Sequence, residues 1–198
     1  GNTVDPWQLI DKYGTDVVRW YFYTINPPGE PKRFNEKDLG ESYRRLIGLL
    51  YNSYVFYTTY DLGMSDIQNI DGKNIRMSDV YILDRWILAR LNETIAGVTE
   101  RLDDYDIGGA AKEIESLVDD LSHWYIRRSR KRHEALPVLG YVLLEISKLI
   151  APFTPFFAEA LYRSILGTSE VPNIDDNNRT SDVQKLKSVH LIDWSVVN

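Results

Sequence analysis

Apolar residues recur every three or four positions through most of the chain, the spacing that places them on one face of an α-helix. The stripes are clearest over about residues 35–60, 78–104 and 106–132. No segment predicts a β-sheet, so the pattern predicts an all-α fold, an antiparallel helical bundle with short connections. The positions expected to face the core are Leu39, Tyr43, Leu46, Ile47, Leu50 and Tyr54, then Ile87, Leu91, Ile95, Val98 and Leu102, then Ile114, Leu117, Val118, Leu121 and Tyr125.

Capping residues and helix breakers place the shorter elements. Asp5 followed by Pro6 predicts a helix start, and Gly14 predicts its end, before a densely apolar helix over about residues 16–24. Segments 26–34, 61–77 and 167–182 are expected to be loops, and residues 189–194 an extended segment lying on the bundle. The remaining helix starts are predicted at Asn35, Ser78, Asp106, Pro137 and Thr154-Pro155.

Composition narrows the class of protein. Hydrophobic residues make up 43% and charged residues 26% of the 198 residues, the balance of a globular domain. The absence of cysteine excludes disulfides and thiolate metal sites. No apolar run approaches the roughly 20 residues of a membrane span, and the first residues do not resemble a signal peptide. We therefore expect no membrane association. The net charge of −6 argues against a surface that is basic all over, but it allows one basic patch.

One such patch lies at the end of a predicted helix, where five of the six residues 127–132 are basic. A helix C-terminus stabilises one or two exposed cations by about 0.3–1 kcal/mol each, but five adjacent charges repel one another and require an anionic partner. Trp124, Arg128 and Lys131 would share a stripe, so a base could stack on the ring while the cations hold phosphates. The pattern favours nucleic-acid binding over the alternative, a solvated basic face with Trp124 in the core.

A second candidate stripe lies on the helix that begins at Asn35. Arg45, Gly48, Leu49 and Asn52 fall on the side away from the apolar residues. An asparagine amide can both donate to and accept from a base edge, and a glycine allows a ribose to approach closely. Asn52 could equally bond between helices. Taken together, the candidate RNA-binding residues are Arg44, Arg45, Asn52, Trp124, Arg127, Arg128, Arg130, Lys131 and Arg132.

The sequence holds no catalytic constellation. His123, His133 and His190 have no metal-ligand spacing, and no glycine-rich phosphate loop occurs. Asp103 and Asp106 are read as a helix stop and a helix cap rather than as an acid–base pair. We therefore expect no catalytic residue, no metal and no cofactor in this chain.

Several motifs follow one another along nearly the whole chain. They are Gly1-Asn2-Thr3-Val4-Asp5-Pro6-Trp7, Lys12-Tyr13-Gly14, Arg19-Trp20-Tyr21, Pro31-Lys32-Arg33-Phe34, Asp84-Arg85-Trp86-Ile87-Leu88, Trp124-Tyr125-Ile126-Arg127-Arg128-Ser129-Arg130, Ala151-Pro152-Phe153-Thr154-Pro155-Phe156 and His190-Leu191-Ile192-Asp193-Trp194. In this order they resemble the part of the class I aminoacyl-tRNA synthetases that follows the catalytic Lys-Met-Ser-Lys-Ser signature. Trp7 and Arg19-Trp20-Tyr21 resemble the isoleucine enzymes more than their valine, leucine or methionine relatives.

The resemblance implies three parts. Residues 35–182 would form a bundle that binds the anticodon stem-loop of isoleucine tRNA, residues 1–34 a helical connector, and residues 183–198 an extended segment packed on the bundle. The full-length protein would be a cytoplasmic isoleucine–tRNA ligase that uses ATP with magnesium, and its nucleotide-binding and editing domains would precede Gly1. The chain itself would be inactive, monomeric and in contact with those domains.

Two departures and two alternatives accompany the resemblance. This chain has Gly48 and Tyr51 where the family often has Asn and Trp, and it makes a short connection, residues 133–137, after the basic cluster. One alternative is a helical protein-interaction module that docks an acidic partner on the same basic face. The other is the equivalent domain of a valine or leucine enzyme.

Overall fold

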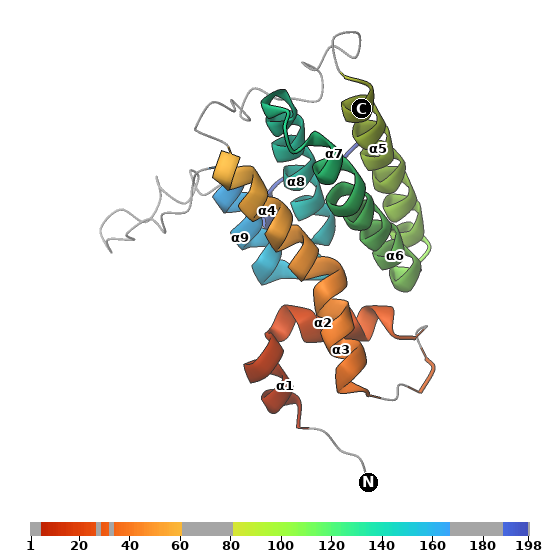
Figure 1. The fold of residues 1–198 in the computed structure, drawn as a ribbon. Helices are drawn as coiled ribbons and strands as arrows, with labels where there is room; N and C mark the ends of the chain where they lie inside the picture. Colours follow the sequence, from red (N-terminus) through yellow and green to blue (C-terminus); the bar gives the residue numbers. More distant parts are fainter. Residues whose placement is uncertain (1–4, 27–28, 32–33, 61–80, 167–187, 198) are drawn as a thin grey trace, which may run out of the picture.

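A computed structural model describes residues 5–26, 29–31, 34–60, 81–166 and 188–197. Within these ranges the chain forms helices and turns without a β-strand, and consecutive long helices run in opposite directions (Figure 1). The predicted all-α antiparallel bundle is therefore confirmed. The elements are α1 (Pro6–Tyr13), α2 (Thr15–Thr24), α3 (Glu36–Tyr43), the π-helical η1 (Arg44–Gly48), α4 (Leu49–Tyr60), α5 (Ile82–Asp103), α6 (Ile107–Asp119), the π-helical η3 (Asp120–Ile126), α7 (Arg127–Ser129), the 3₁₀ turn η4 (His133–Ala135), α8 (Leu136–Ile150), α9 (Pro155–Ile165) and the 3₁₀ turn η6 (Val189–Leu191).

The predicted caps are present. The Asp5 carboxylate accepts a hydrogen bond from the Trp7 amide, and the Asn35 side chain accepts one from the Lys37 amide, both at 3.0 Å. Gly14 ends α1 with φ of 85°, a left-handed conformation that favours glycine. The predicted helix start at Ser78 lies outside the described residues, and so do the predicted loops 61–77 and 167–182. In the described part, α5 begins after Tyr81.

α5 and α6 form a tight hairpin at the lower right of Figure 1. Asp106 caps α6 by accepting a hydrogen bond from the Gly109 amide at 2.9 Å, and the Arg101 side chain donates to the same carboxylate at 2.7 Å. A Cβ atom at Gly109 would lie 1.9 Å from Asp106 Oδ2, so the cap requires glycine at this position.

The predicted core stripes are largely confirmed. The residues of α5 and α6–η3 named from the sequence are buried, apart from Leu102, which is half-buried. Leu39, Leu46 and Leu50 are fully buried, but Tyr43 is 40% exposed, so its prediction as a core residue is wrong. The π-helical turn η1 adds a residue to the turn that follows Tyr43, which rotates this side chain out of line with the leucines.

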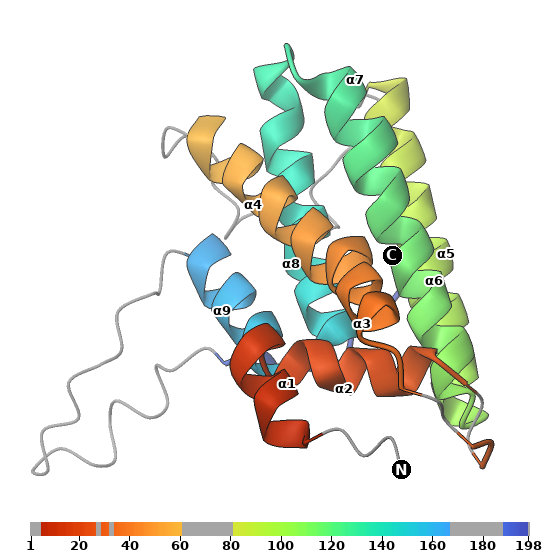
Figure 2. The ribbon, with the colours of Figure 1, turned by 60° about the horizontal axis from the view of Figure 1, so that its bottom comes forward.

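α8 forms the centre of the bundle, where α4, α5 and α9 pack around it (Figure 2). Nearly every α8 residue is buried, which matches its almost continuous apolar sequence. A second, smaller cluster joins α1, α2 and α3 below the bundle, with Val17, Tyr21 and Leu39 in its centre. Trp20 of α2 instead belongs to the main core. The domain boundaries after residues 34 and 182 stay a prediction.

α2 is attached to the corner between α8 and α9 by two opposite charges. The Asp16 carboxylate accepts a hydrogen bond from the Phe157 amide in the first turn of α9 at 2.7 Å. The Arg19 guanidinium donates to the carbonyls of Phe153 and Pro152 just beyond α8, at 3.1 and 3.2 Å. Each charge therefore lies at the helix end whose dipole it complements. Burial raises the pKa of Asp16, although the hydrogen bond from Phe157 opposes the shift.

The C-terminal segment lies on the bundle as predicted, but it begins with a turn. Residues 189–191 form the 3₁₀ turn η6, so the prediction that the whole segment 189–194 is extended is wrong. Ser188 caps this turn by accepting a hydrogen bond from the His190 amide at 3.3 Å. Further along, the Trp194 indole donates to Thr99 Oγ1 at 2.8 Å, which fixes the segment against α5.

Glu159 on α9 anchors this segment, and we expect its contribution to stability to depend on pH. Its carboxylate accepts hydrogen bonds from the Val189 amide, Ser188 and Arg163. Burial alone would raise the pKa of Glu159, but these bonds outweigh burial and hold the pKa below the usual 4.5. Because the folded-state pKa is lowered, the stabilisation is present above the unfolded pKa and is lost as pH falls through the folded pKa.

Glu159→Gln is therefore expected to lower the free energy of unfolding by about 1–2 kcal/mol at pH 7. The difference from the unaltered chain should shrink as the pH falls below 4.5. Urea unfolding of the variant and of the unaltered chain at a series of pH values measures this difference in the free energy of unfolding. A difference that stays constant down to pH 3 would show that the charge of Glu159 does not hold the segment.

Candidate nucleic-acid interface

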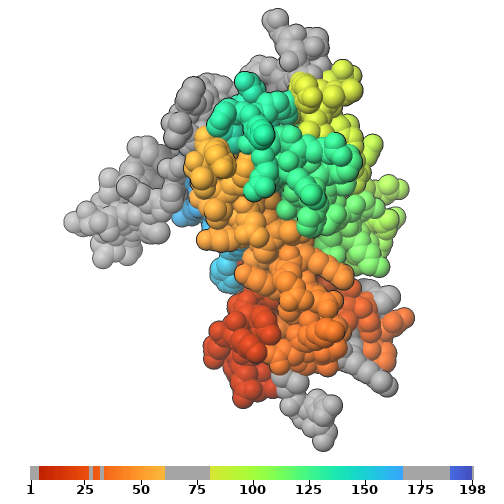
Figure 3. All heavy atoms as spheres, viewed as in Figure 1, coloured from red at the N-terminus to blue at the C-terminus, as the bar shows by residue number. Residues whose placement is uncertain are grey.

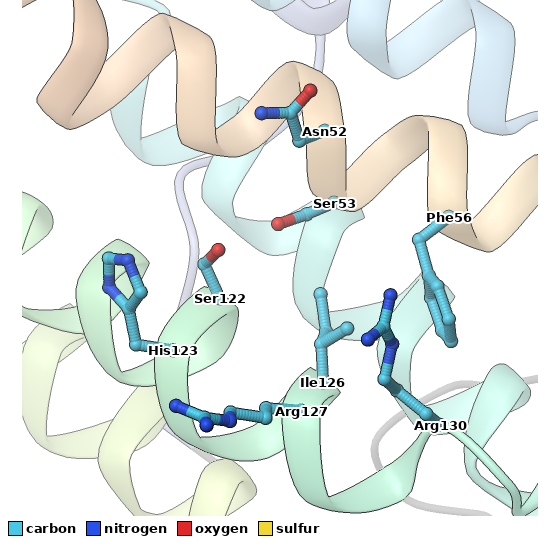
Figure 4. Close-up of a pocket in the computed structure, with 8 residues that line it drawn as sticks. All are labelled: Asn52, Ser53, Phe56, Ser122, His123, Ile126, Arg127 and Arg130. Carbon is cyan, nitrogen blue, oxygen red and sulfur yellow. The ribbon is translucent and has the colours of Figure 1, made fainter.

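A groove of about 460 Å³ lies between α4 and the helix formed by η3 and α7. Figure 3 shows that these two parts of the chain come to the same face of the molecule. The α4 wall and the opposite wall each contribute polar side chains, as the close-up in Figure 4 shows. The lining residues are Asn52, Ser53, Phe56, Ser122, His123, Ile126, Arg127 and Arg130.

Helical spacing builds the basic wall. His123 and Arg127 are four residues apart on the helix that passes from η3 into α7, and Arg130 follows on the turn just beyond the end of α7. Both arginines are exposed, and neither forms an ion pair among the described residues. His123 Nδ1 lies 2.8 Å from the Asp119 carboxylate. Two cations without a local counter-ion beside one groove form a site for an anion such as a phosphate.

The opposite wall offers neutral polar and aromatic groups. Asn52 is exposed at the rim, and the Ser53 hydroxyl donates to the Leu49 carbonyl at 2.8 Å. In Figure 4, Ser53 faces Ser122 across the groove, and Phe56 and Arg130 point toward one another. The groove therefore combines hydrogen-bonding groups, an aromatic ring and two guanidinium groups.

Trp124 and Arg128 lie on the same helix and form a stacked pair. The guanidinium carbon of Arg128 is 3.7 Å from the centre of the indole ring, and Trp124 is 47% exposed. The sequence prediction that the two share an exposed stripe is confirmed. Lys131 does not extend this stripe, because α7 ends at Ser129 and the chain turns at residues 130–131. Lys131 is exposed on that turn.

The structure brings Arg132 to an inward position, away from the groove. Its guanidinium donates to both carboxylate oxygens of Asp84, with Nη1 to Oδ2 at 2.9 Å, and lies 4.2 Å from the ring centre of Tyr81. The buried Tyr125 hydroxyl donates to the same carboxylate at 2.7 Å. Burial is the main cause that raises the pKa of Tyr125, and the Asp84 charge adds to it. Sequence reasoning did not find Asp84 as the partner of Arg132.

Arg44 and Arg45 lie in η1, outside the groove. Both are exposed, and Arg45 lies 3.8 Å from Glu41 and lines a neighbouring hollow of about 310 Å³. Lys112, Glu115 and Asp119 also line this hollow, so its two cations have carboxylates beside them and it is less suited to a phosphate than the groove is. A Cβ atom at Gly48 would make only an ordinary contact, 3.5 Å from the Tyr43 carbonyl, so packing does not demand glycine there.

A comparison with known families identifies the domain. The anticodon-binding domain of tRNA ligases matches residues 84–198, more than half of the chain. The matched part includes η3 and α7, which carry the basic wall of the groove, and α5, which carries Asp84. The chain belongs to the family of anticodon-binding domains of tRNA ligases.

Relatives of this anticodon-binding domain include the isoleucine–tRNA ligase of Dehalococcoides mccartyi (strain CBDB1). It is 40% identical over the whole of this chain, which spans 19% of the relative's length. The isoleucine–tRNA ligase of Deinococcus radiodurans is 38% identical, again over the whole chain and 17% of the relative. The chain thus spans less than a fifth of the length of these ligases.

A solved structure has the same fold. The LeuRS of Agrobacterium radiobacter K84, in a ternary complex with tRNA and LeuAMS, superposes on the whole of this chain with a TM-score of 0.69. The matched part is 21% of that chain, and the sequences are 20% identical. This likeness supports the bundle architecture of the anticodon-binding domain.

Sequence reasoning located part of the groove of this anticodon-binding domain. Asn52, Arg127 and Arg130 were named as candidates and meet in it, although no spacing rule linked the first of them to the others. His123 was missed, but its spacing from Arg127 and Arg130 is a signal that could have found it. Ser53, Phe56, Ser122 and Ile126 have no such signal, because their place depends on how α4 packs against η3.

The described part of the chain has neither a metal-binding cluster nor a helix that could span a membrane. No group of three or more histidine or acidic side chains is placed there to hold a metal ion. No helix in it is both long enough and apolar enough to cross a bilayer.

Proposed function

We propose that this anticodon-binding domain binds the anticodon stem-loop of isoleucine tRNA across the face that contains the groove. The observation that carries the proposal is the basic wall, Arg127 and Arg130, which faces a polar and aromatic wall on α4. Phosphates would bind the guanidinium groups. An unpaired base of the loop would meet Asn52 and Phe56, since single-stranded loops are read by stacking and by base-edge hydrogen bonds.

The other candidate residues would contact the RNA to different extents. Trp124 and Arg128 together present one cationic, aromatic surface on which a base can stack. Lys131 lies on the turn beside the groove and would hold a phosphate of the stem. Arg44 and Arg45 would contact the RNA backbone farther along the same side. Arg132, bound to Asp84, is the candidate least available to the RNA.

The proposal extends to the whole protein of which this chain is a part. It would be an isoleucine–tRNA ligase, the name that its relatives carry. We further propose that it acts in the cytoplasm and uses ATP with magnesium. The nucleotide and the metal would bind to other parts of that protein. This domain would act as a monomer that positions the tRNA and would itself catalyse nothing.

Titration of the chain with isoleucine tRNA and with a non-cognate tRNA tests the proposal. We expect tighter binding of isoleucine tRNA and a strong decrease in affinity with salt. If three to five phosphates are neutralised, the logarithm of the binding constant should fall with the logarithm of salt concentration with a slope of roughly −2 to −4. Fluorescence anisotropy of labelled tRNA between 50 and 200 mM salt measures this slope.

The chain must be folded in every titration, and circular dichroism verifies its helical content at each salt concentration. Salt-independent binding, or no binding to either tRNA by the folded chain, would contradict the proposal and favour a basic face that docks an acidic protein instead. Equal affinity for both tRNAs would support RNA binding but would contradict a preference for isoleucine tRNA.

A further inference from the structure

The basic turn at residues 130–131 is held between a buried residue, Ser129, and a half-buried one, Arg132. On one side, Ser129 is 4% exposed and ends α7. On the other side, the Arg132 amide donates to the Ser129 carbonyl at 2.9 Å, and the Arg132 side chain crosses to Asp84 on α5. Arg130 and Lys131 therefore project from a short loop whose two ends are both fixed to the bundle.

Asp84 is the centre of this arrangement. It is 4% exposed, it receives two bonds from Arg132, and it receives one from the Tyr125 hydroxyl. The same hydroxyl lies 3.4 Å from the Ala135 carbonyl. One carboxylate on α5 thus holds η3 and the residue that follows the basic turn, and the Tyr125 hydroxyl that donates to it also lies near the end of η4. The carboxylate has no function in the groove itself, since it does not line it.

If Arg132 left this site, the buried Asp84 carboxylate would lose its ion pair. A buried carboxylate that loses the cation it is paired with incurs a large desolvation penalty, larger than the gain from one exposed phosphate contact. The ring of Tyr81 covers the guanidinium as well. The charge of Arg132 is therefore used within the protein, although the sequence places it in the basic cluster.

We propose that Asp84 and Arg132 are positioning residues that fix the basic turn, and with it Arg130 and Lys131, in the orientation that binds RNA phosphate. The proposal rests on the proposed function of the groove. It reassigns Arg132 from contact with RNA to the support of its neighbours.

Asp84→Asn provides a test in which the two possible effects have opposite signs. Removing a negative charge beside a basic surface would by electrostatics alone raise the affinity for tRNA. Loss of positioning would lower it instead, and we expect a decrease of about 10-fold, comparable to the loss of one charge-assisted hydrogen bond. Anisotropy titration with isoleucine tRNA measures the affinity at a temperature where circular dichroism shows the variant fully folded.

A double-mutant cycle separates positioning from a general loss of stability. Arg130→Gln should lower tRNA affinity about 10-fold in the unaltered chain but less than about twofold in the Asp84→Asn background, because the side chain is no longer held in place there. Asp120→Asn is the matched control. It breaks the Arg90–Asp120 pair at 3.0 Å, which joins the same two helices away from the turn. In that background Arg130→Gln should keep its full effect.

The possible failures can be told apart. If the unaltered chain does not bind tRNA, the proposed function fails. If it binds, but Asp84→Asn binds as tightly or Arg130→Gln costs the same in both backgrounds, only the positioning role is overturned. Should Asp84→Asn not fold, Tyr125→Phe removes one hydrogen bond to the same carboxylate, and we expect it to lower tRNA affinity about twofold to threefold. An unchanged affinity of folded Tyr125→Phe would then overturn the positioning role.

Discussion

Replacement of both Arg127 and Arg130 by glutamine is expected to lower the affinity for isoleucine tRNA by about 100-fold near 0.1 M salt. Each guanidinium faces the groove without an ion-pair partner among the described residues, so each is free to bind a phosphate. A hydrogen bond between charged groups contributes about 1.5–3 kcal/mol, which corresponds to roughly 10-fold or more per arginine. Two fewer phosphate contacts should also make the salt slope shallower by about 1.4–1.8.

A charge-matched control shows whether the effect belongs to the groove. Arg101→Gln with Arg163→Gln removes the same two charges from α5 and α9, at positions that do not line the groove. This variant should bind tRNA within about twofold of the unaltered chain, because each of these arginines is already paired with a carboxylate of its own and so offers little to a phosphate. Circular dichroism verifies that the variant is folded. An equal loss in both variants would indicate a general effect of net charge and would contradict the groove as the binding site.

Trp20→Ala is expected to cause the largest loss of stability, about 3–5 kcal/mol in the free energy of unfolding. Trp20 is 1% exposed in the main core, although it belongs to the N-terminal helix α2. Its ring lies edge-on to Phe153 with 5.4 Å between ring centres, and its indole N–H donates to Glu115 at 2.9 Å. The substitution would leave a cavity between α2, α6 and the start of α9. Urea unfolding monitored by circular dichroism measures the loss.

Trp7→Ala is the control for this prediction. Trp7 is 71% exposed on α1, so its removal should change the free energy of unfolding by no more than about 0.5 kcal/mol. A small effect of Trp20→Ala would show that α2 is not part of the cooperative unit and would separate the N-terminal helices from the bundle.

The sequence predicts the helices well because local rules decide them. Asp5, Asn35 and Asp106 each cap a helix by bonding to an amide two or three residues ahead, and such bonds depend only on neighbouring residues. Spacing of three and four residues likewise identified the buried faces of three helical segments. Tyr43 is the exception, because the π-helical turn η1 changes the register that the spacing rule assumes.

The groove depends on relations that no local rule contains. Trp124 and Arg128 could be paired from the sequence, because four residues separate them on one helix. Asn52 and Arg130 are 78 positions apart in the sequence, and only the packing of α4 against η3 places them on one groove. The presence of Ser53 and Phe56 in that groove follows from the same packing.

The sequence by itself determined the helical class, the caps, the buried faces of three helical segments and the motifs that resemble the tRNA ligase family, since these rest on spacing and residue type. The tertiary structure decided how the basic residues are divided. Arg127 and Arg130 face a groove, whereas Arg132 is bound to Asp84, which is 48 positions earlier in the chain. All three are arginines of the same cluster, so composition cannot distinguish them. The physical difference is that a buried carboxylate from another helix reaches Arg132, while Arg127 and Arg130 remain exposed to bind an anion from outside.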